Sequence, residues 1–399
     1  MKILWLTLDA LLPLDSAGRV GVYKRIENIY KDNDIYLMYF YSENGELGTS
    51  KKLEEICKEV YGFKRESNAL KLLTNYLAYP YTVSTRISQD FVTKMDEILV
   101  KEEIDLINID FPQMGYSLLK SKNRGDIPIV INQHNIEWQR FVEISNSSSI
   151  SWKRKLFTAI EAKKLKRFEE KLYSKLNVSG FTFVTTEDKK YFIEWINPER
   201  TILETIPGGA EAQYTDIPKI PNNNNMVFVG VMSNELNPEG AIWFIKNVFP
   251  RIKKAVPDAH FTVVGKDPVN DLLELQSEDI TITGFVDDLR PYYDNAKMVV
   301  IPVLHGGGVK LKLLEAMGYR KIIVSTSVGA RGTDFKDKES IYIADSAETF
   351  SEYCINILKN PNEYEYIARN AMGIFDAKYT WQGIGLMYES FLKKCVNKS

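Results

Sequence analysis

The sequence has few cysteines and histidines and no strong excess of charge of either sign. Its 399 residues include only three cysteines, Cys57, Cys354 and Cys395, and three histidines. An odd number of widely separated cysteines argues against a disulfide framework or a metal site and fits reduced thiols in the cytosol. A net charge of -2 and a pI near 6.1 give no general electrostatic reason to expect a nucleic-acid partner.

Long apolar runs are also absent. No segment approaches the roughly 18 uninterrupted apolar residues that a membrane-spanning helix needs. The first residues, MKILWLTLDALLPLDSAG, are similar to a secretory signal peptide in having a lysine, an apolar run and small residues. Asp9 places a carboxylate inside that run, so a strand from Lys2 to Leu8 followed by a loop accounts better for the same residues. We therefore expect a cytoplasmic protein.

Short apolar and β-branched runs recur along the chain, with helical periodicity between most of them. A chain of 399 residues with 44% hydrophobic content should divide into two domains. Continuous apolar strands alternating with helices indicate parallel sheets that are covered on both faces. The expected strands are Ile3–Leu8, Ile35–Tyr41, Leu106–Ile109, Ile129–Ile131 and Phe181–Val184, then Met226–Val229, His260–Val264, Ile280–Thr283, Met298–Ile301 and Ile322–Val324. We predict two doubly wound α/β domains with a boundary in the segment 206–225, which is rich in proline, glycine and asparagine.

The segment from Val300 to Gly332 has the layout of a phosphate site: a buried strand, a glycine-rich loop, a helix and a second strand. Gly306, Gly307 and Gly308 lack a Cβ, so their N–H groups can approach an anion at the N-terminus of a helix predicted from about Lys310 to Met317. Lys310 and Lys312 add positive charge there. Glu315 is suited to accept hydrogen bonds from a ribose diol. Any of these residues can also be explained as a tight turn or a solvated charge.

This segment closely resembles the donor-binding signature of the family 4 glycosyltransferases, in the variant whose loop reads Gly-Gly-Gly before Lys-Leu-Leu-Glu-Ala-Met. The resemblance covers most of the chain and is strongest after about Asn225. Two further segments carry it: 206–210 resembles the interdomain linker of the family, and Tyr379-Thr380-Trp381 with 382–394 resembles its terminal helix. The family has the GT-B fold, two Rossmann-like domains that face a central cleft, with a C-terminal helix crossing back to the first domain. It implies an acceptor-binding domain of residues 1–207 joined by 380–399, and a nucleotide-sugar-binding domain of residues 208–379.

The resemblance assigns further residues to the donor site. Gly284 and Val286, in the turn Gly284-Phe285-Val286, match the base-binding turn, although a plain strand exit explains them nearly as well. Gly18 and Arg19, in the loop 13–19, match the loop that lies against the donor phosphate. His134, after a buried strand, matches the first-domain histidine near the reacting sugar, and His305 adjoins the glycine loop. Structural roles remain open for both histidines.

Two departures from the family pattern affect the chemistry. The usual Arg and Lys after the first strand of the second domain are missing from 228–240, which leaves Ser233 and Asn234 as neutral donors. The first Glu of the family's paired-Glu element is replaced by Gly307. Neutralisation of the diphosphate then depends on Lys310 and Lys312, because the only Asp-x-Asp triplet, Asp32-Asn33-Asp34, precedes a strand and is a poor metal site. We expect no metal and no cofactor other than the nucleotide-diphosphate sugar as co-substrate.

These residues predict a retaining, metal-independent glycosyltransferase, with His134, Lys310 and Lys312 as its catalytic residues. The family's retention is usually explained by front-face attack, in which the leaving phosphate helps to take the acceptor proton, so no protein base is assigned. The acceptor would be a saccharide, a lipid-linked or a protein-linked group in cell-surface polysaccharide or glycoconjugate assembly. The alternatives are a sugar-nucleotide epimerase or phosphorylase on the same fold, and a non-catalytic scaffold for a partner transferase. A dehydrogenase is disfavoured, since no Gly-x-Gly-x-x-Gly follows Leu8.

The segment Trp152–Lys175 is rich in Lys and Arg, with Trp152, Leu156, Phe157 and Ile160 interleaved. One interpretation is a basic amphipathic face that rests on anionic lipid at the inner face of the cell membrane. The other is a solvated helix with Glu161, Glu169 and Glu170 at helical spacing, which the pattern favours.

Overall fold

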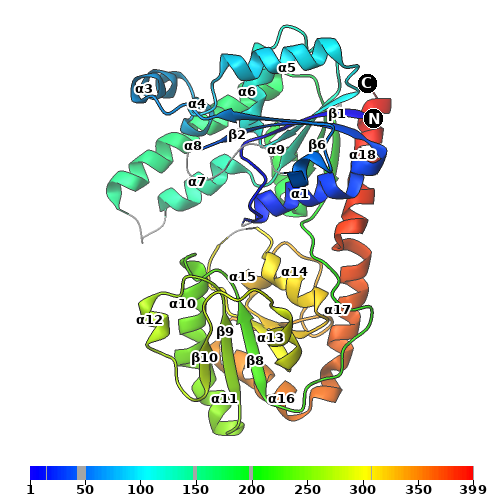
Figure 1. The fold of residues 1–399 in the computed structure, drawn as a ribbon. Coiled ribbons are helices and arrows are strands. Elements are labelled where there is room, and N and C mark those ends of the chain that lie inside the picture. The colour runs from blue at the N-terminus through cyan, green and yellow to red at the C-terminus, as the bar shows by residue number, and fades with distance from the viewer. Residues whose placement is uncertain (15, 43–50, 147–150, 197–200, 307, 399) are drawn as a thin grey trace. The chain divides into compact units, whose positions relative to one another are not determined.

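The computed structural model describes residues 1–14, 16–42, 51–146, 151–196, 201–306 and 308–398. The chain forms two compact units, Met1–Pro207 with Ile384–Ser399, and Gly208–Gly383. Each unit is built on its own parallel sheet with helices packed against it (Figure 1). The predicted α/β class with two doubly wound units is confirmed. No helix in the described part of the chain combines the length and apolar content that a bilayer crossing requires.

The first unit contains a seven-stranded sheet in the order β3-β2-β1-β4-β5-β6-β7, and all neighbouring strands are parallel. Its strands are β1 Lys2–Thr7, β2 Asp34–Tyr41, β3 Glu59–Lys64, β4 Leu106–Asp110, β5 Ile129–Gln133, β6 Val178–Phe183 and β7 Ile202–Thr205. Alternate side chains of β1 reach opposite faces. Leu4 and Leu6 join the cluster around Phe91 and Leu172, whereas Trp5 lies 5.8 Å from the ring of Tyr388 on the other side. Burial on both faces explains the unbroken apolar sequence of these strands.

The helices of the first unit connect these strands, and the last one comes from the end of the chain (Figure 1). They are α1 Ala17–Ile29, α2 Lys51–Glu54, α3 Ala69–Ala78, α4 Tyr81–Ser84, α5 Gln89–Lys101, α6 Gly115–Lys120, α7 Glu137–Asn146, α8 Trp152–Lys175 and α9 Thr186–Ile196, with 3-10 turns at Tyr30–Asp32 and Pro112–Met114. Helix α18, Trp381–Asn397, belongs to this unit from Ile384 onward. Gly180 of β6 lies so close to Cys395 and Phe391 of α18 that an added Cβ would meet them at 2.5 and 2.6 Å.

The second unit contains a six-stranded parallel sheet in the order β10-β9-β8-β11-β12-β13. Its strands are β8 Asn225–Val229, β9 His260–Val264, β10 Ile280–Ile282, β11 Met298–Ile301, β12 Ile322–Ser325 and β13 Tyr342–Ile343. Its helices are α10 Leu236–Trp243, α11 Phe249–Ala255, α12 Asn270–Leu273, α13 Arg290–Asn295, α14 Leu311–Gly318, α15 Ser327–Ala330, α16 Ala347–Lys359 and α17 Glu365–Lys378, with a π-helical segment Phe244–Val248 and a 3-10 turn Pro361–Tyr364. In β8, Met226 and Phe228 pack into one cluster, and Val227 and Val229 pack into the cluster on the opposite face.

The predicted strands are all present, with ends that differ by up to three residues. Three strands were missed: β3, β7 and β13. The residues of β3 include Gly62 and are half-buried except for Lys64, which is exposed; those of β7 are half-buried throughout, and β13 has only two residues. All three lie at sheet edges, where the apolar signal is weak because one side of the strand is not covered by a neighbour. The helix predicted from Lys310 begins at Leu311.

The strand order fixes where ligands can bind. In the first sheet the connections run outward from β1 to β3 and then return to β4 on the other side of β1; in the second sheet they run outward from β8 to β10 and return to β11. Connections that leave in opposite directions open a crevice at the carboxyl ends of the two central strands. The loops after β1 and β4, and those after β8 and β11, therefore form the expected binding edge of each unit.

Two glycines allow the backbone segments after β8 and β9 to pack closely against each other at this edge. Gly265, directly after β9, packs against the backbone of Gly230, directly after β8, and a Cβ on Gly265 would lie 1.7 Å from the carbonyl oxygen of Gly230. Both glycine N–H groups are engaged, Gly230 with the Val264 carbonyl at 2.9 Å and Gly265 with the Gly284 carbonyl at 3.1 Å. The backbone after β8 is thus held against its neighbours.

We predict that Gly265→Ala destabilises the second unit by at least about 2 kcal/mol, because the new methyl group cannot fit without moving the backbone. Gly373→Ala is the matched control: this glycine lies inside α17, and an added Cβ would meet nothing within 4 Å. It should raise stability by up to about 1 kcal/mol, because alanine favours a helix. Scanning calorimetry measures both, and a Gly265→Ala transition at or above the wild-type temperature would contradict the packing argument.

Candidate functional site

The glycine-rich loop of the second unit connects β11 to α14 at the carboxyl edge of the sheet. Gly306 has φ of 107° and Gly308 has φ of 68°, both in the region that favours glycine. A Cβ on Gly306 would come within 2.8 Å of Leu236, at the start of α10, so the loop lies against the segment that follows β8. Gly307, predicted to bind the donor, lies outside the described residues.

Lys310 is the N-cap residue of α14. The sequence had suggested instead that it lies in the first turn of the helix. Its ammonium group donates hydrogen bonds to the carbonyls of Gly306 at 3.1 Å and Gly308 at 3.0 Å, so the loop folds around this charge. Burial, and next the nearby positive charge of Arg331, lower the pKa of Lys310 to about 8. Arg331, just after α15, is therefore a third cation of this region, one to which the sequence assigned no role.

Lys312 lies in the first turn of α14 and reaches toward the strand-exit segment of β8. Its ammonium group donates a hydrogen bond to the side-chain oxygen of Asn237 and lies 5.1 Å from the centre of the Phe228 ring. Burial lowers the pKa of Lys312 to about 8, and the charge of Lys310 acts in the same direction. Because the charge of Lys310 is felt at Lys312, the two lysines are close enough to act on a single anion.

Asn237 holds Lys312 in place. This residue of α10 is 5% exposed, and its amide nitrogen donates to the carbonyl of Val231 at 2.7 Å, which leaves the amide oxygen facing the lysine. Gly230 makes room for the arrangement, since a Cβ there would lie 3.0 Å from Asn237 and 3.4 Å from the Lys312 nitrogen. Asn237 belongs to the segment 228–240, in which the sequence showed only that basic residues are missing. A side chain that orients a lysine leaves no pattern of its own in the sequence.

Glu315 follows on the same helix in a largely apolar setting. Burial raises the pKa of the Glu315 carboxyl, while Tyr293 and the charge of Lys312 act in the opposite direction. The Tyr293 ring stacks on Tyr319 with centroids 4.0 Å apart and an interplanar angle of 13°. A carboxylate that few groups satisfy within the protein is suited to accept hydrogen bonds from a diol.

The other residues predicted for donor binding lie on separate loops of this unit. Gly284 has φ of 71°, and its carbonyl accepts the Gly265 N–H; Val286, like Val309 and Leu311, packs against the core cluster of this unit. Ser233 is exposed, with its hydroxyl 3.4 Å from a carboxylate oxygen of Asp267. His305 is 69% exposed and lies 3.7 Å from a carboxylate oxygen of Glu239. The structure thus brings Lys310, Lys312 and Gly306 together and places His305 at the rim.

In the first unit, His134 follows β5 and rests on the end of β4. Its Nε2 atom lies 2.7 Å from a carboxylate oxygen of Asp110, and its ring stacks on Phe111 with centroids 4.3 Å apart. Phe111 has φ of 70°, a conformation that is rare for residues with a side chain. This strained backbone turns the Phe111 ring beneath the imidazole.

Asp110 is fully buried and shared by several partners. The indole N–H of Trp5 donates to its other carboxylate oxygen, and a guanidinium nitrogen of Arg25 lies 3.9 Å from the oxygen that faces His134. Trp5 and Arg25 both present donors to the Asp110 carboxyl, so its oxygens act as acceptors, which favours the tautomer of His134 that carries its proton on Nε2. The Nδ1 atom of His134 is then left as a hydrogen-bond acceptor. The sequence identified His134 but not Asp110, which reads there as the last residue of a strand.

Gly18 and Arg19 begin helix α1 in the same unit. A Cβ on Gly18 would lie 3.7 Å from the Phe111 ring, so this glycine, Phe111 and His134 share one region. The backbone N–H of Arg19 donates to the hydroxyl of Ser16, the N-cap residue of α1, at 3.4 Å. Asp15, within the predicted loop, lies outside the described residues.

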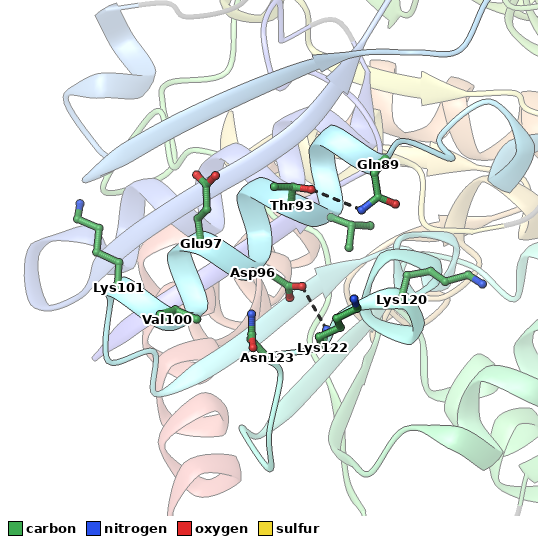
Figure 2. A pocket seen from close by; sticks show the side chains of 10 residues that line it. Gln89, Thr93, Asp96, Glu97, Val100, Lys101, Lys120, Lys122 and Asn123 are labelled. Atoms are coloured by element: carbon green, nitrogen blue, oxygen red, sulfur yellow. Dashed lines mark hydrogen bonds between the residues drawn. The ribbon is translucent and has the colours of Figure 1, made fainter.

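A surface hollow of about 670 Å³ also opens on this unit, along α5 and the loop that follows α6 (Figure 2). None of the predicted site residues lines it. Its carboxylate Asp96 already accepts hydrogen bonds from Ser121 and from the backbone of Lys122, and the Gln89 amide donates to Thr93 at 3.4 Å. The hollow therefore does not contain the chemistry predicted from the sequence.

Comparison with known proteins shows what the second unit and the whole chain are similar to. Residues 223–360 match the family described as Glycosyl transferases group 1. A relative from Klebsiella pneumoniae, described as an uncharacterized 44.6 kDa protein in the cps region, is 25% identical over 390 residues, which cover 95% of this chain and 96% of that protein. The matched residues lie within the second unit, Gly208–Gly383.

Solved structures share the fold along the whole chain at low identity. Sucrose-phosphate synthase from Thermosynechococcus elongatus superposes with a TM-score of 0.69 at 15% identity, covering 100% of both chains. HepE of Anabaena in complex with UDP and glucose gives 0.61 at 14% identity over 98% of this chain and 99% of that one. TarM of S. aureus, in complex with fondaparinux, alpha-GlcNAc-glycerol and UDP, gives 0.66 at 10% identity over 100% and 99%. The fold is that of the GT-B glycosyltransferases.

We predict that Lys310→Met and Lys312→Met each weaken binding of a nucleoside diphosphate by about tenfold to a hundredfold, the usual value of a hydrogen bond to a charged group. Calorimetric titration measures the affinity. Lys321→Met is the matched control, because the pKa of this lysine is also lowered to about 8 by burial while its ammonium group donates to the Ala296 carbonyl at 3.0 Å. Unchanged affinity in the variant that carries both Lys310→Met and Lys312→Met would rule out the lysine pair as the phosphate site.

The same lysines predict a pH dependence. Only a protonated ammonium attracts the diphosphate, so affinity should be full below the lowered pKa values and fall as the pH rises through about 8. Lysines with an ordinary pKa, near 10.4, would hold the affinity constant to a much higher pH. The affinity is measured by titration across this range in one buffer system, and a flat profile past pH 8 would contradict the assignment.

We further predict that Asp110→Asn changes the tautomer of His134 and lowers the rate of sugar transfer by at least about tenfold, without weakening nucleotide binding to the second unit. The chain has three histidines, so nitrogen NMR can follow each imidazole separately. Asp96→Asn, a carboxylate of the same unit away from His134, is the control. Unaltered His134 nitrogen shifts in Asp110→Asn would show that the carboxylate does not set the tautomer.

Proposed function

We propose that this protein is a retaining, metal-independent glycosyltransferase that moves a sugar from a nucleotide-diphosphate donor to a saccharide-containing acceptor. The observation that carries the proposal is the pair Lys310 and Lys312, partly buried and adjacent at the N-terminus of α14, where the strand order opens a crevice. The group 1 domain match over residues 223–360 supports the same assignment.

The chemistry of transfer requires charge stabilisation at the leaving diphosphate. As the bond between sugar and diphosphate breaks, negative charge builds on the phosphate oxygens, and preorganised cations lower the energy of that state. Lys310 and Lys312 are held by the loop carbonyls and by Asn237 before any ligand binds, so they need little reorganisation. Two ammonium groups at this position perform the task that a divalent cation performs in metal-dependent transferases.

The remaining donor contacts follow from the position of each residue. Glu315 would receive the ribose hydroxyls, Gly284 and Val286 would border the base, and Gly306 with Gly308 would approach the phosphates. HepE is described in complex with UDP and glucose, and TarM with UDP, which makes a uridine diphosphate sugar the first donor to test. In the first unit, the Nδ1 atom of His134 would accept a hydrogen bond from a sugar hydroxyl.

We propose that the acceptor belongs to cell-surface polysaccharide or glycoconjugate assembly, as a saccharide, lipid-linked or protein-linked group. The location of the Klebsiella pneumoniae relative in a cps region supports this setting. A cytoplasmic site of action is supported by the three cysteines, which form no disulfide and are buried, with thiol pKa values raised by burial. Thiols of this kind suit a reducing compartment.

The first test is the thermal stability of the purified protein with UDP, GDP, TDP, CMP and their sugars, each with and without EDTA. A ligand that binds only the folded state raises the unfolding temperature by mass action. We expect one nucleotide family to shift the transition equally with and without the chelator. A shift abolished by EDTA would contradict the proposal that donor binding needs no metal ion. No shift with any nucleotide would favour a non-catalytic scaffold.

Glu315→Gln separates the ribose role from the phosphate role. The amide keeps the shape of the carboxyl but accepts hydrogen bonds less strongly, so nucleotide affinity should fall by about tenfold while affinity for inorganic diphosphate stays unchanged. Glu239→Gln, an exposed acid beside His305, is the control.

Release of free sugar or sugar phosphate without any acceptor would instead identify the epimerase or phosphorylase alternative.

A further inference from the structure

Helix α3 exposes its apolar side chains. Its sequence is ALKLLTNYLA, none of its residues is buried, and Leu70, Leu73 and Leu77 are 72%, 60% and 77% exposed. Their spacing of three and four residues places them on one face of the helix. An ordinary surface helix turns such a stripe toward the core, whereas α3 turns its leucine stripe toward solvent.

The first turns of α8 show the same feature. Trp152, Leu156 and Ile160 follow each other at intervals of four residues and are 70%, 55% and 42% exposed, and Phe157 beside them is 42% exposed. Further along α8 the apolar residues Leu165, Phe168 and Leu172 are buried. The exposure is therefore confined to the N-terminal part of the helix.

Aromatic and polar contacts join the two helices, which lie on the same side of the first unit in Figure 1. The Phe157 ring stacks on Tyr76 of α3 at 6.3 Å and meets Tyr81 of α4 at the same distance. The Lys164 ammonium lies 3.6 Å from the centre of the Tyr76 ring, and the Glu161 carboxylate accepts the Tyr81 N–H at 2.7 Å. Segments about 75 residues apart in sequence thus form one surface.

We define the α3–α8 surface by the exposed apolar residues of its two helices: Leu70, Leu73, Leu77, Trp152, Leu156, Phe157 and Ile160. Isolated apolar side chains at a surface are common, but seven on two joined helices make a contiguous patch of the kind that marks a contact site. Leaving it in water is unfavourable, at roughly 25 cal/mol for each Å² of apolar area.

Basic side chains outnumber acidic ones around this surface, although Lys71 also pairs with Glu66 at 3.4 Å. Residues 68–82 and 151–160 include four basic side chains, Lys71, Lys153, Arg154 and Lys155, and no acidic one. The first turn of α8 has no acidic residue although it is the positive end of a 24-residue helix dipole. The Lys153 ammonium lies 5.8 Å from the Trp152 ring, which places a cation beside the most exposed aromatic residue of the patch.

We propose that the α3–α8 surface docks on an anionic lipid bilayer. Leucine and aromatic side chains would enter the boundary between headgroups and acyl chains, tryptophan favours that boundary, and the lysines and arginine would meet the negative headgroups. The basic charges distinguish this occupant from a neutral apolar partner. None of the residues assigned to sugar transfer belongs to this surface, so bilayer docking and transfer can be tested separately.

The test is co-sedimentation of the full-length protein with vesicles of phosphatidylcholine alone and of phosphatidylcholine with phosphatidylglycerol. We expect binding to the anionic vesicles only, weakened by added salt, because screening reduces the attraction between the basic residues and the headgroups. Lys153→Glu with Arg154→Glu should reduce this binding by more than about tenfold, since each basic residue near an anionic surface contributes about fivefold. Lys254→Glu, an exposed lysine of α11, is the control and should bind like wild type.

The apolar part is tested with Leu73→Gln and Leu77→Gln on α3, and with Trp152→Gln and Leu156→Gln on α8. Each pair should reduce vesicle binding, whereas Val100→Gln and Leu386→Gln, at side chains that are 71% and 65% exposed elsewhere, should not. All these residues are exposed, so the variants should keep the wild-type unfolding temperature and nucleotide affinity. These two readouts separate loss of docking from loss of the proposed transferase site.

Three outcomes would overturn the proposal. Equal binding to neutral and anionic vesicles would show that the basic residues do not determine docking. Binding to neither kind of vesicle would show that the surface does not dock on a bilayer. The third is self-association in sedimentation velocity that the Leu73→Gln and Trp152→Gln pairs abolish, without any vesicle binding. It would show that the surface is an interface between two copies of this chain.

Discussion

The reversal of strand order at the centre of each sheet is the constraint on which the candidate sites depend. Because the connections leave β8 and β11 in opposite directions, a crevice is expected at the carboxyl ends of these two strands, where their loops lie. The second unit fills that edge with lysines on α14, fixed by carbonyls of one loop and by Asn237 of the other. Burial keeps these cations poorly solvated, which lowers their pKa and strengthens their attraction for an anion. The first unit places His134 and Asp110 at the corresponding edge.

The fold could be predicted from sequence where strands are covered on both faces. β8 and β11 consist almost wholly of apolar residues because helices pack on each side of them, and their position in the sequence is unambiguous. The edge strands β3, β7 and β13 carry mixed residues, since neighbouring strands and helices cover them only in part. Their assignment depends on pairing with a strand already in place, a non-local interaction that residue patterns do not encode.

The candidate site was predictable to the extent that its groups lie on one continuous segment. Glycines, lysines and a glutamate between 306 and 315 carry the spacing of a loop that enters a helix, so their roles follow from the local sequence. Asn237, Arg331 and Asp110 act on these residues or on His134 across the fold, and each reads in the sequence as an ordinary polar residue. The exposure of the α3 leucines was equally hidden, because a stripe of leucines at helical spacing predicts burial until the structure shows which way the face points.

The discontinuity of the first unit has a consequence for how the chain acquires its structure during synthesis. Tyr388 of α18 donates a hydrogen bond to Asn108 of β4 at 2.8 Å, and Phe391 and Cys395 pack against Gly180 of β6, so the last turns of the chain complete the interior of the unit that is made first. Helix α18 must therefore leave the ribosome before that unit can close. The second unit, an uninterrupted stretch from Gly208 to Gly383, can fold earlier although it is translated later.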